Sequence, residues 1–136
     1  MLVIDTSALI AIFRLEPEAE SFLKAIVHAE RRAMSALSVL EASMVMSGGG
    51  ADAAAFEPLD EFLLEAGVEI VAFDAAQART AREAFLRFGK GRHKAALNLG
   101  DCASYALAKS RGAPLLYKGE DFRRTDIIAA IHSAAM

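Results

Sequence analysis

The chain has 136 residues, of which 54% are hydrophobic and 24% charged, and its mean hydropathy is +0.30. These values exclude a disordered chain or a collagen-like repeat, and the length predicts a single domain over residues 1–136. With a net charge of −3, the protein lacks the uniformly basic character of a bulk nucleic-acid binder. The single cysteine, Cys102, excludes an internal disulfide and a CxxC zinc site.

The N-terminal residues indicate where the protein resides. Only four apolar residues, Met1 to Ile4, precede Asp5, and no basic residue precedes them, so no signal peptide is expected. No apolar run approaches the roughly 20 residues that a membrane helix requires. We therefore expect a soluble cytoplasmic protein, in keeping with the single cysteine. Its high apolar content favours an oligomer interface or a docking groove.

The first half of the chain predicts two strands and four helices. The apolar run before Asp5 is typical of a buried strand, and Asp5, Thr6 and Ser7 are all residue types that begin helices. Three glycines at 48–50 end the third helix. In chain order, we expect a strand at 2–4, a helix at 8–13, a helix starting at 17, a strand at 31–34 and helices at 36–46 and 51–64.

The second half continues the same alternation. In chain order, we expect a strand at 68–73, a helix capped by Asp74 and closed by Gly89, a basic loop at 90–94, a helix starting at Asn98 or Gly100 and ending near 112, a strand at 113–117 and a C-terminal helix from about 125. Because strands alternate with helices throughout, we predict one α/β domain with a mostly parallel central sheet sandwiched by helices.

Four acidic residues occupy informative places in this pattern. Asp5 follows the first strand and Asp121 follows the last, and parallel sheets form ligand sites beyond these strand ends. Glu41 interrupts an apolar helix face, where an unpaired carboxylate is costly. Asp101 begins a later helix. Each position also has an ordinary explanation, since caps, first turns and solvated edges commonly carry acids.

Taken together, the four acids can converge on one cleft. Carboxylates in one cleft repel each other, so such a cluster is best explained as a set of ligands for a hard cation. All-oxygen ligation favours Mg²⁺, with Mn²⁺ possible, over zinc. The histidines at positions 28, 93 and 132 show no ligand spacing, and Cys102 is expected to be a small buried residue.

Four segments of the sequence occur in a characteristic order. They are VIDTSAL at 3–9, SALSVLE at 35–41, LNLGDC at 97–102 and LLYKGEDF at 115–122. Together they resemble the motifs of PIN-domain nucleases, and within them the VapC-type toxins of type II toxin–antitoxin systems. The resemblance spans nearly the whole chain, so residues 1–136 are expected to form one PIN domain. It implies that Asp5, Glu41, Asp101 and Asp121 are the catalytic acidic quartet.

The resemblance also implies a mechanism, in which a Mg²⁺-dependent endoribonuclease hydrolyses RNA and leaves a 5′-phosphate and a 3′-hydroxyl. Asp5 and Asp101 are expected to hold the metal, and Glu41 to orient a metal-bound water. Asp121 is expected to complete the acidic set or to help hold a second ion. Glu120 and Asp126 are assigned no primary role.

Hydroxyl and basic residues beside the quartet are candidates for binding substrate. Thr6 or Ser7 matches the family's hydroxyl position near the metal. Basic residues could hold the RNA backbone, and solvated loops are the alternative explanation. These basic candidates are Arg92, His93, Lys94 and Lys118, with Lys90, Arg123 and Arg124 nearby.

The resemblance implies two protein partners, a second copy in a homodimer and a cognate VapB-type antitoxin. Apolar residues of the first two helices are candidates for the antitoxin groove, and core packing is the alternative for most of them. These residues are Leu9, Ile12, Phe13, Phe22 and Leu23.

Other functions are consistent with parts of the pattern. A PIN-like module could bind RNA or protein without cutting, and a PIN nuclease could process RNA outside a toxin–antitoxin system. A dehalogenase-like phosphatase needs a second Asp two residues after the first, where Ser7 stands. A phospho-receiver domain needs paired early acids and an Asp on a middle strand, and the sequence has neither.

Overall fold

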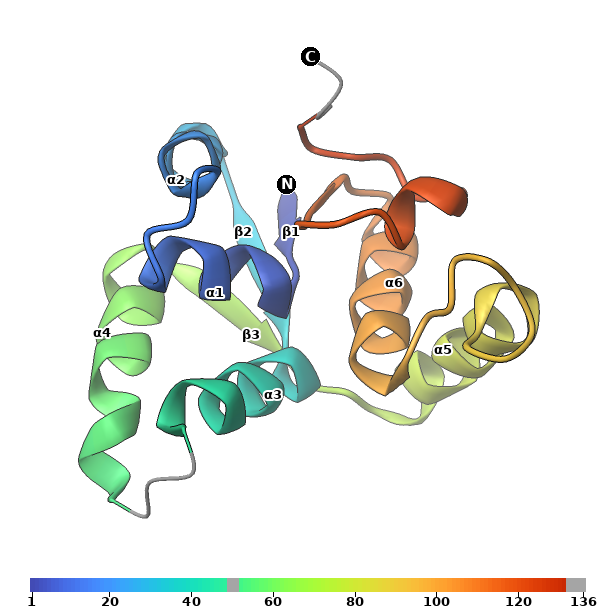
Figure 1. Cartoon of the computed structure of the whole chain (residues 1–136), viewed down its shortest axis with the longest axis horizontal. Coiled ribbons are helices and arrows are strands. Elements are labelled where there is room, and N and C mark those ends of the chain that lie inside the picture. Colours follow the sequence, from blue (N-terminus) through green and yellow to red (C-terminus); the bar gives the residue numbers. More distant parts are fainter. Residues whose placement is uncertain (49–51, 132–136) are drawn as a thin grey trace.

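A parallel sheet forms the centre of the computed structural model, which describes residues 1–48 and 52–131 (Figure 1). Its order is β3-β2-β1-β4, and every neighbouring pair is parallel. The strands in the described residues are β1 (Leu2–Ile4), β2 (Arg32–Ser35), β3 (Val68–Val71) and β4 (Leu115–Leu116). Because β1 lies between β2 and β4, the residue that follows β1 lies between those that follow its neighbours.

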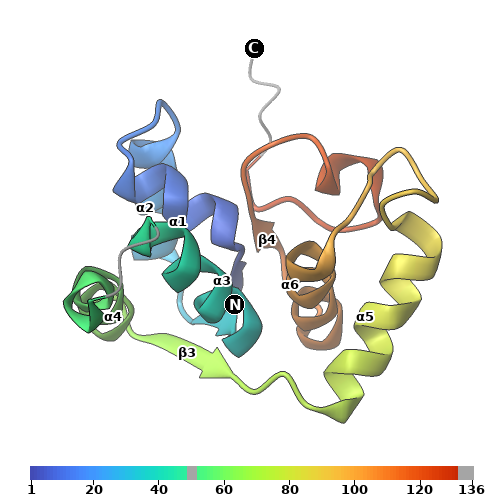
Figure 2. The same ribbon diagram turned by 60° about the horizontal axis from the view of Figure 1, so that its bottom comes forward.

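Helices connect the strands and cover both faces of the sheet. They are α1 (Thr6–Phe13), α2 (Ala19–His28), α3 (Ala36–Ser47), α4 (Glu57–Glu65), α5 (Ala75–Phe88) and α6 (Leu99–Arg111), with short 3₁₀ helices η1 (Ala53–Phe56) and η2 (Phe122–Arg124). Figures 1 and 2 show α5 and α6 on one side and α1, α2 and α4 on the other. The predicted α/β fold with a parallel sheet between helices is confirmed.

Alternation along β1 creates two separate cores. Leu2 and Ile4 pack with α1, α2 and α4, whereas Val3 packs on the opposite face with α5 and α6. This is the period of two that a strand buried on both faces requires. Helix α3 contacts both α1 and α6, so it joins the two halves at the end of the sheet where β1 terminates.

The predicted helix at 51–64 is divided in the structure, and its first residue, Ala51, lies outside the described residues. The chain forms η1 and then starts α4 at Glu57, with Pro58 in the first turn of that helix. Proline lacks the amide hydrogen that an interior helical position donates, but the first turn has no partner for that hydrogen. Pro58 therefore begins a helix instead of lying inside one.

The prediction of a C-terminal helix from about 125 is wrong for residues 125–131. After η2 the chain becomes extended and runs along β4, where Leu115 N donates to Ile128 O (2.9 Å) and Ala130 N donates to Leu115 O (2.9 Å). Pairing with the outer edge of β4 satisfies backbone groups on both segments. The rest of the predicted helix, together with His132, lies outside the described residues.

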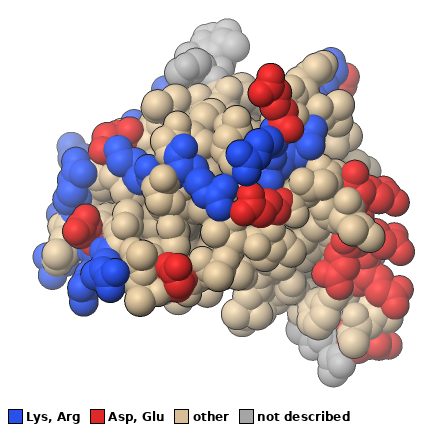
Figure 3. Space-filling model, turned by 180° about the vertical axis from the view of Figure 1, so that it is seen from behind, with Lys and Arg blue, Asp and Glu red and all other residues tan. Residues whose placement is uncertain are grey.

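Charged residues are unevenly distributed over the surface. In Figure 3 acidic side chains gather at one end of the back face, whereas a band of basic side chains crosses its middle. Helix α4 carries four exposed acids, at positions 57, 60, 61 and 65. Helix α5 carries three exposed arginines, at positions 79, 82 and 87. Within the described ranges, every helix is too short or too polar to span a bilayer.

Candidate active site

Asp5 is the most deeply buried acid of the predicted quartet, with 3% of its surface exposed. It caps α1, and its Oδ2 accepts hydrogen bonds from the amide (3.0 Å) and the hydroxyl (2.6 Å) of Ser7. Its Oδ1 accepts a hydrogen bond from the Ser104 hydroxyl at 2.5 Å. Burial raises the pKa of Asp5, and these donors oppose the shift by stabilising the ionised form.

Buried hydroxyls connect Asp5 to two further helices. Ser104 donates its proton to Asp5, so Ser38 must be the donor in the 3.1 Å contact between the Ser38 and Ser104 hydroxyls. The Thr6 hydroxyl in turn donates to the Ser38 carbonyl at 3.1 Å. This network fixes α1, α3 and α6 around one carboxylate. The sequence prediction missed Ser38 and Ser104, although each lies three residues from Glu41 or Asp101 and so shares its helix face.

Ser7 also ties the last strand to the first. Its hydroxyl oxygen accepts a hydrogen bond from the backbone amide of Lys118 at 3.0 Å while donating to Asp5. The Lys118 ammonium points elsewhere and contacts Glu16 (2.9 Å) and Glu18 (3.4 Å). Of the two candidate hydroxyls, that of Ser7 contacts Asp5, whereas that of Thr6 faces α3.

Asp101 lies in the first turn of α6 within a capping box. The backbone amide of Asp101 donates to Asn98 Oδ1 (2.9 Å), and the backbone amide of Asn98 donates to Asp101 Oδ2 (3.1 Å). Burial raises the pKa of Asp101 to about 7, and repulsion from Asp5, Asp121 and Glu41 adds to the rise. The other three acids of the predicted quartet therefore all lie near enough to Asp101 to disfavour its ionised form.

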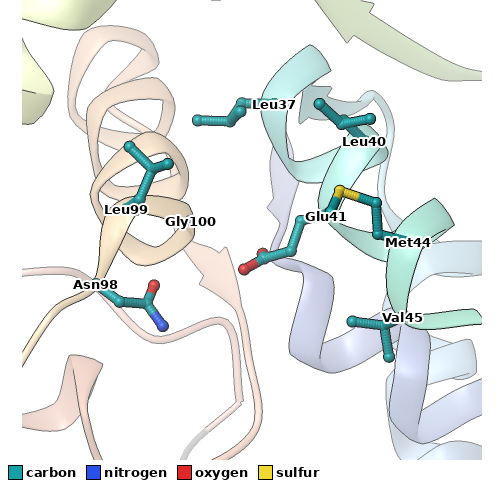
Figure 4. A pocket seen from close by; sticks show the side chains of 8 residues that line it. All are labelled: Leu37, Leu40, Glu41, Met44, Val45, Asn98, Leu99 and Gly100. Atoms are coloured by element: carbon teal, nitrogen blue, oxygen red, sulfur yellow. The ribbon is translucent and has the colours of Figure 1, made fainter. Parts of the chain in front are cut away.

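Glu41 approaches this cluster from α3. Figure 4 shows its carboxylate directed across a pocket toward the start of α6. The pocket has a volume of about 420 Å³ and is lined by Leu37, Leu40, Glu41, Met44, Val45, Asn98, Leu99 and Gly100. Most of this lining is apolar, and the Glu41 carboxylate lies beside the first turn of α6.

Asp121 completes the set from the loop after β4. It is exposed and directly precedes Phe122, which has 2% of its surface exposed and packs against Tyr117 with ring centroids 5.1 Å apart. Phe122 belongs to the hydrophobic core, so it anchors this turn. The loop carrying Asp121 is thus attached at both ends, at Phe122 and through the amide of Lys118.

Comparisons with known proteins agree with this arrangement. The PIN domain family model matches residues 2–128. A protein named Ribonuclease VapC from Mycolicibacterium smegmatis is 52% identical over 131 residues, covering 96% of this chain and 100% of the relative. Ribonuclease VapC30 from Mycobacterium tuberculosis is 50% identical over 126 residues, covering 93% and 95%. The chain belongs to the VapC family of PIN-domain proteins. The predicted family is therefore confirmed.

Solved structures of low sequence identity share the PIN fold of this chain. Mycobacterium tuberculosis VapC20, described as a sarcin-ricin loop cleaving toxin, superposes with a TM-score of 0.74 at 15% identity, covering 94% of this chain and 97% of that one. The VapBC2 complex of Rickettsia felis, bound to a promoter DNA fragment, gives a TM-score of 0.72 at 18% identity, covering 94% and 95%. At these identities the likeness concerns the fold.

The donor chemistry of the PIN site fits a hard divalent cation. Carboxylate oxygens are the ligands that Mg²⁺ and Mn²⁺ prefer. Burial is the main cause of the raised pKa of Asp101, and the nearby charges of Asp5, Asp121 and Glu41, which a cation would neutralise, add to it. In residues 1–48 and 52–131, however, no three His, Cys, Asp or Glu side chains are arranged to hold an ion as they stand. One oxygen of the Asp101 carboxylate, Oδ2, accepts a hydrogen bond from the backbone amide of Asn98.

The other two acids of the last segment, Asp126 and Glu120, bind side chains outside the predicted quartet. Asp126 accepts hydrogen bonds from the Tyr105 hydroxyl (2.6 Å) and the Lys109 ammonium (3.0 Å). Glu120 pairs with Arg123 at 3.0 Å. Asp126 therefore fastens the C-terminal segment to α6.

The predicted basic loop is exposed between α5 and α6. Arg92, His93 and Lys94 all face solvent. His93 Nδ1 accepts a hydrogen bond from the Ala95 amide at 2.9 Å, and its ring packs edge-on against Phe88. The loop is thus a locally held turn that presents positive charge.

The structure corrects two of the candidates for an antitoxin groove. Leu9 and Phe22 have 0% and 5% of their surface exposed and belong to the core, because α1 and α2 pack these residues against the sheet. Ile12 and Phe13 are partly buried, and Leu23 is 40% exposed. Cys102 is buried, as predicted.

Proposed function

We propose that this protein is a metal-dependent endoribonuclease that acts as the toxin of a toxin–antitoxin pair. One observation carries the proposal: Asp5, Glu41 and Asp121 lie near enough to Asp101 for each of them to raise its pKa. Relatives named as VapC ribonucleases, about half identical over nearly the whole chain, support the reaction. Solved VapBC complexes with the same fold support a VapB-type antitoxin as partner.

Each acid has a role that follows from its surroundings. Asp5 and Asp101 would hold Mg²⁺, which lowers the pKa of a bound water and neutralises charge on the scissile phosphate. Glu41 accepts a proton from the attacking water and keeps its oxygen in line with the leaving 3′-oxygen. Asp121 completes the acidic set from the loop after β4. Ser7 and Ser104 favour the ionised form of Asp5 and fix its carboxylate by donating to its two oxygens.

RNA binds along the exposed basic loop. Arg92, His93 and Lys94 stand in solvent next to the segment that leads to Asp101, where they can contact phosphates. The Lys118 side chain is engaged by Glu16 and Glu18, so Lys118 acts on the site through its amide. Thr6 serves the site by holding α3.

The protein acts in the cytoplasm as a homodimer. A buried, unpaired cysteine suits a reducing compartment. Exposed apolar side chains beside the cleft supply surface for a second copy, since Leu40, Met44 and Leu99 are 55%, 65% and 73% exposed.

The test is cleavage of an RNA pool by the purified chain with Mg²⁺, Mn²⁺ or EDTA. Asp5→Asn and Asp101→Asn should abolish cleavage, because each removes a ligand charge while keeping the side-chain volume. Glu20→Gln is the matched control, since Glu20 is an exposed acid paired with Lys24 on α2.

The outcomes distinguish the candidate functions. Cleavage that requires metal and is lost in both active-site variants establishes the nuclease. Metal-independent cleavage, or cleavage by both variants at the wild-type rate, would refute the acidic mechanism. RNA binding without cleavage in any metal would favour the PIN-like binding module. A nuclease that a co-expressed VapB-type partner fails to inhibit would instead belong to RNA processing.

A further inference from the structure

The Glu41 carboxylate lies directly against the backbone of Gly100. Figure 4 shows the Glu41 side chain extending from α3 to the first turn of α6, where Gly100 lies. A Cβ atom added to Gly100 would overlap both carboxylate oxygens of Glu41 and its Cδ. The carboxylate therefore fills the space that a side chain at position 100 would occupy.

The backbone conformation does not explain a glycine at this position. Gly48 and Gly112 end helices with φ of 58° and 57°, a left-handed conformation that favours glycine. Gly100 is instead inside α6, where the backbone is helical and alanine is more favourable than glycine. The close approach of Glu41 accounts for the missing side chain.

This approach sets where the Glu41 charge lies. The first turn of a helix carries free amide hydrogens and partial positive charge, so a carboxylate is favoured there. The next residue along α6 is Asp101, and the proximity of Glu41 is one cause of the raised pKa of Asp101. The two carboxylates therefore both lie at the start of α6.

We propose that Gly100 is a positioning residue, whose lack of a side chain lets the Glu41 carboxylate lie against α6 beside Asp101. The role of Glu41 in orienting the attacking water rests on the proposed function, whereas the contact itself belongs to the fold. The pocket of about 420 Å³ gives a displaced Glu41 side chain room to rotate away. A methyl group at position 100 therefore displaces the carboxylate without unfolding the domain.

Gly100→Ala tests this directly. We expect a melting temperature equal to or above that of the wild type, because alanine favours the helix. A misplaced reacting group costs on the order of 100-fold in rate, so we expect kcat for RNA to fall by about that factor with little change in KM. A crystal structure of the variant should show the Glu41 carboxylate moved away from α6.

A double-mutant cycle separates positioning from packing. The Glu41 charge lies near Asp101 and attracts a cation held there without ligating it. If Gly100 acts through Glu41, Gly100→Ala should therefore lower the Mn²⁺ affinity in the wild-type background and change nothing further in a Glu41→Ala background. Wild-type kcat in Gly100→Ala, with Glu41 in its original place, would overturn the inference. A large fall in melting temperature would also overturn it, by showing that Gly100 serves packing.

The inference and the proposed function can fail separately. If the wild type cleaves no RNA, the proposed nuclease is refuted. The position of Glu41 and the Mn²⁺ affinity of Gly100→Ala still decide the role of Gly100.

Discussion

Ser104→Ala removes a single hydroxyl and tests how the Asp5 carboxylate is held. Ser104 is 1% exposed and donates to Asp5 Oδ1 at 2.5 Å, so its loss leaves a buried carboxylate oxygen without this donor. A hydrogen bond to a charged group contributes about 1.5–3 kcal/mol to the free energy of unfolding, and we expect a loss of that size near neutral pH. Urea denaturation measures it.

The pH dependence of this loss carries the sharper test. Burial already raises the pKa of Asp5 in the folded chain, and removal of a donor to its ionised form raises that pKa further. Because the pKa of Asp5 is higher in the folded chain than in the unfolded chain, protonation of Asp5 stabilises the folded chain. This contribution is fully present below the pKa of Asp5 in the unfolded chain, and it is lost as pH rises through the pKa of Asp5 in the folded chain. The difference between the wild type and Ser104→Ala should therefore be small in acid and grow toward neutral pH.

A matched control lies on the same helix. Ser110 is exposed on α6, donates to the Leu107 carbonyl at 3.0 Å and contacts Gln77, so Ser110→Ala removes a hydroxyl remote from Asp5. We expect it to change stability by about 0.5 kcal/mol or less at every pH. Equal losses in the two variants, or a Ser104→Ala loss that does not change with pH, would refute the reasoning.

Three further predictions concern the metal, the RNA and the core. The pKa of Asp101 is about 7, and metal ligation requires its ionised form. The Mn²⁺ affinity measured by calorimetry should therefore rise with pH and level off above about pH 7. An affinity that falls as pH rises would contradict this prediction. Replacing Arg92 and Lys94 by alanine should raise KM for RNA and leave kcat unchanged. The slope of log binding constant against log salt concentration should become shallower by about 0.7 for each lost phosphate contact. An unchanged slope would show that this loop does not bind the RNA backbone. Phe122→Ala should cost about 3–5 kcal/mol in urea denaturation, because Phe122 is 2% exposed, and a loss below about 1 kcal/mol would show that the turn is not anchored.

Local sequence signals predicted the strands and singled out the four acids. Asp5 and Asp121 follow apolar runs, which mark strand ends, and the parallel order of the sheet brings such ends together. Glu41 was conspicuous because it interrupts an apolar helix face. These signals depend on neighbours a few residues away, so they are visible in a single sequence.

Contacts between distant segments could not be predicted in the same way. Ser38 and Ser104 are small residues on apolar helices, and only their partners reveal them as supports for Asp5. The glycine at position 100 likewise acquires a meaning only from Glu41 on another helix. Residues after 125 have a helical composition, but pairing with β4 outweighed that local preference, as tertiary contacts often do.

The position of β4 in the sheet has a consequence for the timing of activity during synthesis. β1 is made first, yet its register with β4 is completed by Leu115 and Leu116, and the Ser7 hydroxyl accepts its hydrogen bond from Lys118. A nascent chain therefore holds Asp5 beside an incomplete sheet until residues 115–118 have been made. Asp5 and Asp121 can thus come together only after β4 has paired with β1.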